Sequence, residues 1–411
     1  MKNIKYLFCL LSVFSFYKSY AQKDTLSVKN NTAVKTQLPT IDSSKQIDAI
    51  DILYRILGKT AAETQRQKSR KLNFSLVPAF GYSLSTGFAV DLTGNVAFYT
   101  SSAHTENLSE IDAEQIFDTK GQVIFTSRSE IWAHDNDYKF VTDLRLERYP
   151  EDTYGIGTGT SQAKQNPIDF TYLRTYFTFF KKIVPDVYGG AGYNLDYHYN
   201  ISQTGNADNT VSDFTKYGFA PQSTSSGVTL NLLYDSRRNK INPLGGGLAS
   251  ITYRDNFTFL GSDNSWQELS MEFKKFLKLS DQSNNILAFW SIAQFTWGNV
   301  PYLDLPATGE DMYNNSGRGY PQDRFRGKNF LYVESEYRFG ITKNGLIGGV
   351  VFANAESLSE FQTNRFQKIA PAAGTGLRVK INKHSDTNVC LDYAAGLYGS
   401  HGIFVNLGEM F

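Results

Sequence analysis

The chain has 411 residues, with 41 Lys and Arg against 40 Asp and Glu, a formal net charge of +1 and a mean hydropathy of −0.35. The balanced charge excludes the strongly basic footprint of a nucleic-acid-binding domain, and the low hydropathy excludes a bundle of apolar membrane-spanning helices. Aromatic residues reach 14%, with 25 Tyr and 30 Phe, a supply that the aromatic girdles of a transmembrane β-barrel would use. An aromatic-rich soluble β-sandwich is the alternative at this level.

Residues 1–21 have the features of a secretory signal peptide. Lys2 and Lys5 precede an apolar run from Leu7 to Phe16, and a small-x-small cleavage site ends at Ala21. A signal of this kind directs the mature chain out of the cytoplasm.

Residues 22–70 are expected to be a periplasmic linker that carries one short helix. Apolar residues recur at helical spacing between Ile47 and Leu57. Ser43 begins a capping box, and Gly58 fits a C-terminal stop. We expect this amphipathic helix to dock on the rim of a barrel, to plug its mouth, or to cover a loose apolar edge.

Between residues 71 and 411 the helical period disappears, and polar and apolar residues alternate with a period of two, as in barrel strands. The alternation predicts fourteen strands, at 86–100, 120–134, 137–149, 169–181, 186–200, 224–236, 246–259, 264–278, 285–299, 328–339, 346–354, 372–381, 386–396 and 401–411. Residues 72–82 could supply a further strand, and one more pairing would raise the count to sixteen. Both counts satisfy the even strand number of bacterial barrels.

The prediction for the whole chain is an all-β fold: a transmembrane antiparallel β-barrel of about 14 strands, or 16 in the alternative, with a short N-terminal periplasmic helix. The domains are a signal peptide at 1–21, the linker and helix at 22–70, and an outer-membrane β-barrel domain at 71–411.

Ionisable residues gather on one face of several predicted strands. In the strand at 328–339, Glu334, Glu336 and Arg338 alternate with apolar residues, and the strand at 137–149 shows the same pattern. Basic groups that face lipid near the bilayer centre cost about 2–4 kcal/mol each, so the charged faces should turn to the lumen.

The predicted connections alternate between short and long, as expected for short periplasmic turns and long external loops. The short turns are 135–136, 182–185, 281–284, 342–345 and 382–385. The long connections are 101–119, 150–168, 201–223, 300–327 and 355–371, while 260–263 and 397–400 are short external exceptions.

Arg318-Gly319-Tyr320, placed before a strand that contains Glu336, resembles the signature loop of the BamA/TamA-type outer-membrane assembly barrels, also called the bacterial surface antigen family. The resemblance covers about residues 72–411, and the family's usual sixteen strands favour the higher count. Four further stretches resemble the family in the same order: Gly81-Tyr82-Ser83 to Thr86-Gly87, Tyr149-Pro150 to Gly157, Tyr234-Asp235-Ser236-Arg237 to Gly245, and Asn406-Leu407-Gly408.

The resemblance implies that the loop at 300–327 folds back into the lumen as a latch. It implies that Arg318 pairs with Glu336, and that Tyr320 packs against the barrel wall. The family's second acidic position is occupied here by Asn354, so the arginine would meet one carboxylate and one amide. The candidate lumen latch comprises Arg318, Gly319, Tyr320, Glu336 and Asn354. An ordinary solvated loop is the alternative reading.

The closing strand of the barrel is predicted at 401–411, and its candidate residues are Asn406, Leu407, Gly408 and Phe411. The alternation places Phe411 on the lipid face, at the periplasmic aromatic girdle.

The resemblance implies a protein of the outer membrane of a Gram-negative bacterium that assists insertion or translocation of proteins or lipids there. The seam between the first and last strands would be its working part. A passive pore or small-solute channel is the alternative function. Expected partners are outer-membrane lipids and lipopolysaccharide, together with unfolded outer-membrane proteins or a subunit supplying the periplasmic domains that residues 22–70 are too few to form. No nucleic-acid partner is expected.

No enzymatic activity is predicted. The five histidines lie on separate loops and strand ends, without a pair at metal-ligand spacing, and none of the usual nucleophile, phosphate-loop or zinc motifs occurs. Neither a metal site nor a cofactor is expected.

Overall fold

The structure is a computed structural model of the chain, and it describes residues 46–49, 51–52, 72–83, 87–101, 107–280, 283–383 and 386–411. The predicted signal peptide and most of the predicted linker and helix lie outside these residues. No helix in the described part of the chain is both long and apolar enough to cross a membrane.

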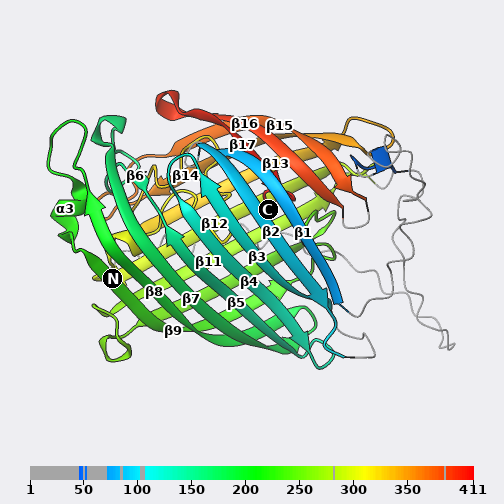
Figure 1. Ribbon diagram of the computed structural model, residues 1–411, viewed down its shortest axis with the longest axis horizontal. Helices are drawn as coiled ribbons and strands as arrows, with labels where there is room; N and C mark the ends of the chain where they lie inside the picture. The colour runs from blue at the N-terminus through cyan, green and yellow to red at the C-terminus, as the bar shows by residue number, and fades with distance from the viewer. Residues whose placement is uncertain are drawn as a thin grey trace, which may run out of the picture. The chain divides into compact units, whose positions relative to one another are not determined.

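The described residues form one antiparallel sheet in which sixteen long strands pair as neighbours in chain order (Figure 1). The strands are β1 (Leu72–Ser83), β2 (Gly87–Phe98), β3 (Ser109–Asp118), β4 (Val123–Ala133), β5 (Tyr138–Arg148), β7 (Asn166–Val184), β8 (Val187–Gln203), β9 (Gln222–Asp235), β10 (Gly246–Asn256), β11 (Trp266–Lys278), β12 (Ile286–Gly298), β13 (Asn329–Gly340), β14 (Ile347–Leu358), β15 (Ala370–Asn382), β16 (Thr387–Gly396) and β17 (His401–Leu407).

The remaining elements lie in the connections. The three-residue strand β6 pairs with the start of β7. These elements are β6 (Glu151–Thr153), the helix α3 (Asp213–Gly218), and the 3-10 turns η4 (Gln162–Lys164), η5 (Thr258–Leu260), η6 (Tyr302–Asp304) and η7 (Leu397–Gly399).

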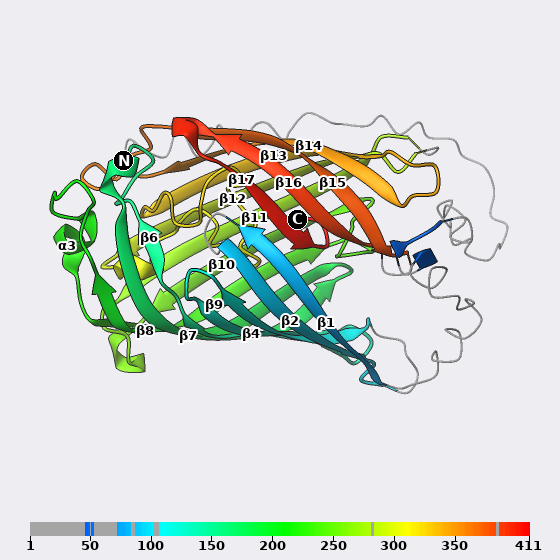
Figure 2. The same cartoon turned by 45° about the horizontal axis from the view of Figure 1, so that its top comes forward.

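The sheet wraps round an interior, so that its first and last strands meet (Figures 1 and 2). Cα atoms of β1 and β17 come within 8 Å of each other, yet no ladder joins these two strands in the residues that the structure describes. The prediction of an all-β barrel is confirmed, and the seam between β1 and β17 is left without strand pairing.

The predicted count of fourteen strands is wrong, and the alternative of sixteen matches the described sheet. The segment at 72–82 is β1, and the predicted loop at 101–119 contains β3. The segment of β3 is rich in acidic residues, which are depleted in strands, and so it is expected to be a loop, although Glu110, Asp112 and Glu114 do alternate with Ile111 and Ala113. Its ladders with β2 and β4 supply the pairing that sequence alone does not reveal.

The presence of β3 also changes the predicted connections. Asn107 donates its backbone N–H to Oδ1 of Asn136 at 2.6 Å, so the described part of the β2–β3 connection lies at the end of the barrel that carries the short turns. The β3–β4 connection at 119–122 lies at the opposite end. The prediction of one long external loop at 101–119 is therefore wrong.

The two faces of the strands differ as the alternation predicts. In β13, Glu334, Glu336 and Arg338 are buried, whereas Leu331 and Val333 are exposed. A sheet that buries its ionisable residues and exposes its apolar ones suits a lipid environment outside and a polar lumen inside. The prediction that charged faces turn inward is confirmed.

The described part of the predicted N-terminal helix contacts the rim formed by two short turns. Ile47 donates its backbone N–H to the carbonyl of Asn344 at 3.1 Å. Asp48 accepts from the backbone of Lys383 at 2.9 Å, and Asp51 accepts from the Lys383 ammonium at 2.7 Å. Of the three expected positions for this segment, these contacts match docking on the rim.

The end of the chain departs from the predicted strand. β17 stops at Leu407, and Gly408 has a φ of +90°, which glycine adopts without steric cost. Glu409, Met410 and Phe411 are buried in the interior. The prediction that Phe411 lies on the lipid face is wrong, because the turn at Gly408 ends the alternation and directs the last residues inward.

Candidate functional site

The connection between β12 and β13, residues 299–328, folds into the barrel interior, and we call it the inward loop. Tyr320 and Phe325 are buried at 2% and 0% exposure, and Arg318, Arg324 and Arg326 are buried as well. Three buried arginines need hydrogen-bond acceptors, either within the loop or on the barrel wall. The structure therefore places this loop in the barrel interior, as the resemblance implies.

Arg318 lies at the centre of a buried group of charges. Its side chain is 1% exposed. Nη2 contacts the carboxylates of Glu334 and Glu336 on β13, and Nη1 donates to Oδ2 of Asp392 on β16 at 2.5 Å. A planar guanidinium held by three carboxylates fixes both the position and the orientation of the loop.

The sequence anticipates one of these three partners. Glu336 is the predicted partner, whereas Glu334 and Asp392 were missed. The sequence does contain a sign that Glu334 could join Glu336, because the two residues are two positions apart and so share one face of the strand. No sequence pattern indicates Asp392 as a partner, since only the wrapping of the sheet brings β16 to the loop.

Two further arginines extend the network toward the end of the chain. Arg338 bridges Glu336 at 2.6 Å, and Arg378 contacts Asp392 and donates from Nε to Glu409 at 2.8 Å. The network comprises the acids Glu334, Glu336, Asp392 and Glu409 and the bases Arg318, Arg338 and Arg378. Each charge has a partner of opposite sign, which buried ions require.

Asn354 contacts the backbone of Arg318 instead of its guanidinium. Its Nδ2 donates to the Arg318 carbonyl at 2.9 Å. The guanidinium lies over the ring of Phe352, with 3.6 Å between its carbon and the ring centroid. The arginine thus meets three carboxylates and an aromatic face, where the resemblance implied one carboxylate and one amide.

Gly319 and Tyr320 bring the loop against β15 and β16. Gly319 has a φ of +108°, and a Cβ there would stand 2.7 Å from Cβ of Ala372, so only glycine fits. The Tyr320 hydroxyl donates to the carbonyl of Pro371 at 2.7 Å and accepts from the backbone of Leu397 at 2.9 Å. Tyr320 therefore packs against the wall, as the resemblance implies.

The closing-strand candidates have separate environments. Leu407 is exposed on the outer face, and Asn406 is half-buried on the inner face. The ring of Phe411 stacks on Trp290 with centroids 5.1 Å apart, and Arg338 donates to the Phe411 backbone oxygen at 3.0 Å. The residues after β17 are thus attached to the same charge network as the loop.

A mutation at Asn354 tests how the loop backbone is held. We expect Asn354→Asp to lower the free energy of unfolding by about 1–3 kcal/mol. An aspartate cannot donate to the Arg318 carbonyl, and it adds a carboxylate beside Glu334, its cross-strand partner. The measurement is the temperature at which heat-modifiable gel mobility is lost. Asn354→Ala separates the lost donor from the added charge, and an Asn354→Asp protein as stable as the parent would contradict this role of the amide.

A cavity of about 360 Å³ lies between the inward loop and strands β5 and β7 to β12. Its walls carry many charged side chains. Arg254 donates to Asp196 at 2.6 Å, and Arg174 lies 3.4 Å from the same carboxylate. Burial, with the nearby Asp196 carboxylate, raises the pKa of Asp304 in the loop to about 7. The cavity therefore suits water, ions or a small polar solute.

Solved structures with a similar fold are known. BamA from Haemophilus ducreyi lacking POTRA domains 1–3 matches 82% of this chain and 70% of its own, with a TM-score of 0.55 and 14% identity. CdiB from Acinetobacter baumannii gives a TM-score of 0.53 at 13% identity over 83% and 60% of the two chains, and CdiB from Escherichia coli gives 0.52 at 10% over 86% and 70%.

This likeness is one of structure. No protein-family model matches the sequence, and no curated protein matches it. The chain spans 60% to 70% of the length of the BamA and CdiB structures. The chain therefore has the fold of the BamA and CdiB barrels.

Proposed function

We propose that the protein is an outer-membrane β-barrel of the BamA/TamA type, which assists proteins or lipids in entering or crossing the outer membrane of a Gram-negative bacterium. The similarity to BamA and CdiB barrels and the apolar exposed face of the sheet support this proposal. Fold likeness alone does not establish an activity, so the proposal depends on a local feature of the sheet.

The seam between β1 and β17 is that feature. β17 spans seven residues and pairs with β16, while no ladder to β1 exists in the described part of the sheet. Strand edges present backbone donors and acceptors that another strand can use. We infer that an unfolded outer-membrane protein adds a strand there, and that outer-membrane lipids or lipopolysaccharide contact the same opening.

The inward loop argues against a passive pore. Its buried side chains, including Arg318, Tyr320 and Phe325, occupy the interior that an open channel would need. A fixed plug is compatible with work at the wall of the barrel, because clients at the seam need no passage through the lumen.

We propose no catalytic role. His198 Nδ1 lies 3.7 Å from Asp304, and Ser225 donates its hydroxyl to Asp304 at 2.6 Å. A serine nucleophile needs a base that takes its proton, normally an imidazole oriented by a carboxylate. Here the aspartate stands between the serine and the histidine, so the hydroxyl is held and not activated.

Locking the seam tests the proposed function. We expect a disulfide between cysteine at Val405 and cysteine introduced at residues 77–80 of β1 to abolish insertion of an unfolded outer-membrane protein into reconstituted liposomes. Reduction should restore the insertion, because it reopens the seam. The measurement is the folded fraction of the client in a Cys390→Ala background.

A disulfide between cysteines at Tyr393 and Ile403 is the matched control. These residues are exposed cross-strand partners in the ladder between β16 and β17, so the bond leaves the seam free. A locked seam with full insertion activity would contradict the proposal. Steady single-channel conductance from the same locked protein would instead support the passive pore.

A further inference from the structure

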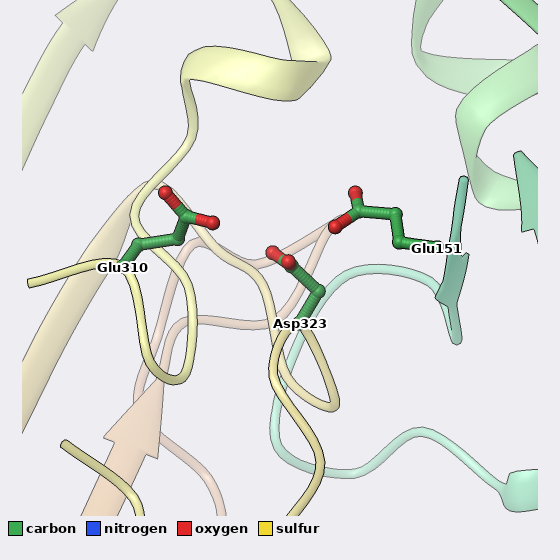
Figure 3. A group of neighbouring side chains, drawn as sticks. All are labelled: Glu151, Glu310 and Asp323. Carbon is green, nitrogen blue, oxygen red and sulfur yellow. The ribbon is translucent and has the colours of Figure 1, made fainter. Parts of the chain in front are cut away.

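Three carboxylates meet where the inward loop passes the segment that follows β5. Glu310 and Asp323 belong to the loop, and Glu151 belongs to β6; Figure 3 shows the three side chains pointing toward one another. One oxygen from each lies within 4.8 Å of the other two. Asp323 is fully buried, and the Glu151 side chain is 7% exposed.

The positive charge beside this group comes from Arg326. Its Nη2 contacts Asp323 and lies 3.5 Å from Glu151. Its Nη1 is within hydrogen-bond distance of three loop carbonyls, those of Tyr302, Leu303 and Leu305. One guanidinium thus pairs with two of the three carboxylates. Like charges this close in a buried site repel strongly unless a further cation or proton joins them.

The adjoining cavity adds to this imbalance. Glu151 and Glu310 line it, and its walls carry more acidic than basic side chains. The acidic lining residues are Asp143, Glu147, Glu151, Asp196, Glu268, Asp304 and Glu310, and the basic ones are Arg145, Arg174, Arg254 and Arg326. With these carboxylates ionised, the field of the cavity favours a cation.

Two buried carboxylate oxygens in the group have no hydrogen-bond donor. They are Oδ2 of Asp323 and Oε1 of Glu151. Glu310 is held differently, because its Oε1 accepts from Nε2 of Gln322 at 2.8 Å, and Gln322 accepts in turn from the Tyr149 hydroxyl at 2.8 Å. Buried polar oxygens without a donor point to a missing electropositive partner.

We propose that Glu151, Glu310 and Asp323 form a binding site for a hard divalent cation, Ca²⁺ or Mg²⁺. Carboxylate oxygens are the ligands that these ions prefer, and the group offers no sulfur or nitrogen ligand that would select zinc or copper. Water from the cavity would complete the coordination shell, since both ions commonly keep bound water.

The cation would fasten the inward loop at a second place. Arg318 attaches the loop to β13 and β16, whereas the cation attaches it to the segment after β5. Glu310 and Asp323 lie on either side of Arg318 in the loop. Removing the cation with a chelator should therefore free these two parts of the loop from Glu151, while the contacts of Arg318 persist. This inference goes beyond the proposed function and holds whether the barrel inserts proteins or conducts solutes.

The test uses the full mature chain in detergent, stripped with chelator and then transferred to chelator-free buffer. We expect saturable binding of Tb³⁺, with luminescence sensitised by the nearby Tyr149, and displacement by Ca²⁺ or Mg²⁺. Glu310→Gln and Asp323→Asn should weaken binding by about tenfold or more, since loss of even an outer-shell partner of a metal typically costs about 10–100-fold in affinity. Glu268→Gln, which alters the same cavity outside the group, is the matched control and should bind like the parent.

A second measurement uses no variant, so it does not depend on whether the variants fold. In the unmodified protein, Ca²⁺ or Mg²⁺ should slow tryptic cleavage within residues 299–328, and chelator should reverse the effect. Proton sharing is the competing explanation, because burial, with the Asp323 carboxylate, raises the pKa of Glu310 to about 7. Protection by acidification alone, without saturable cation binding by the unmodified protein, would overturn the proposal. So would unchanged binding in folded Glu310→Gln.

Discussion

Replacing Arg318 with alanine should destabilise the barrel by about 3–5 kcal/mol, the range observed when one partner of a buried ion pair is removed. The substitution leaves Glu334, Glu336 and Asp392 without the guanidinium that they share. It also removes the cation from the face of Phe352. The protein should lose heat-modifiable gel mobility at a lower temperature, and the inward loop should become accessible to external protease.

Two variants separate the role of Arg318 from a general effect of losing an arginine. Arg318→Lys should restore part of the stability, since an ammonium keeps the charge but cannot bond three carboxylates in one plane. Arg148→Ala removes an arginine whose ion pair with Asp169 is exposed, so it should change stability by less than about 1 kcal/mol. If Arg318→Ala matched the parent in both melting and protease resistance, the inward loop would not be held by this residue.

Phe411→Ala should also destabilise the barrel by about 3–5 kcal/mol, the cost of truncating a buried phenylalanine and leaving a cavity. The ring packs against Trp290 and Phe276, and Arg338 lies over it at 5.1 Å. Its loss should free the residues after Gly408 and weaken the charge network around Arg338. Thermal unfolding followed by gel mobility measures the effect.

Leu407→Ala is the control for Phe411→Ala. Leu407 is 46% exposed on the outer face, so its truncation creates no interior cavity and should cost much less. Equal losses in the two variants would contradict the inward packing of Phe411, because a residue on the lipid face would respond like Leu407.

The amino-acid sequence determined the fold class and the facing of the strands. Period-two alternation is a local property, and the cost of a charge in lipid decides which face of a strand turns inward. For that reason the charged face of β13 followed from a short stretch of sequence. The wall contact of Tyr320 followed from the resemblance to the family's signature loop. The pairing of Arg318 with Glu336 followed from the family resemblance.

Only the tertiary structure decided which distant residues meet. β3 forms because β2 and β4 pair with it, although its acidic residues have a low strand propensity. Asp392 reaches Arg318, and Glu151 reaches Glu310, because the sheet wraps and a loop enters its interior. The inward course of Phe411 depends on the backbone angle of Gly408 and on a ring-sized space beside Trp290. Contacts of this kind are set by strand register and enclosure, and local alternation carries no information about either.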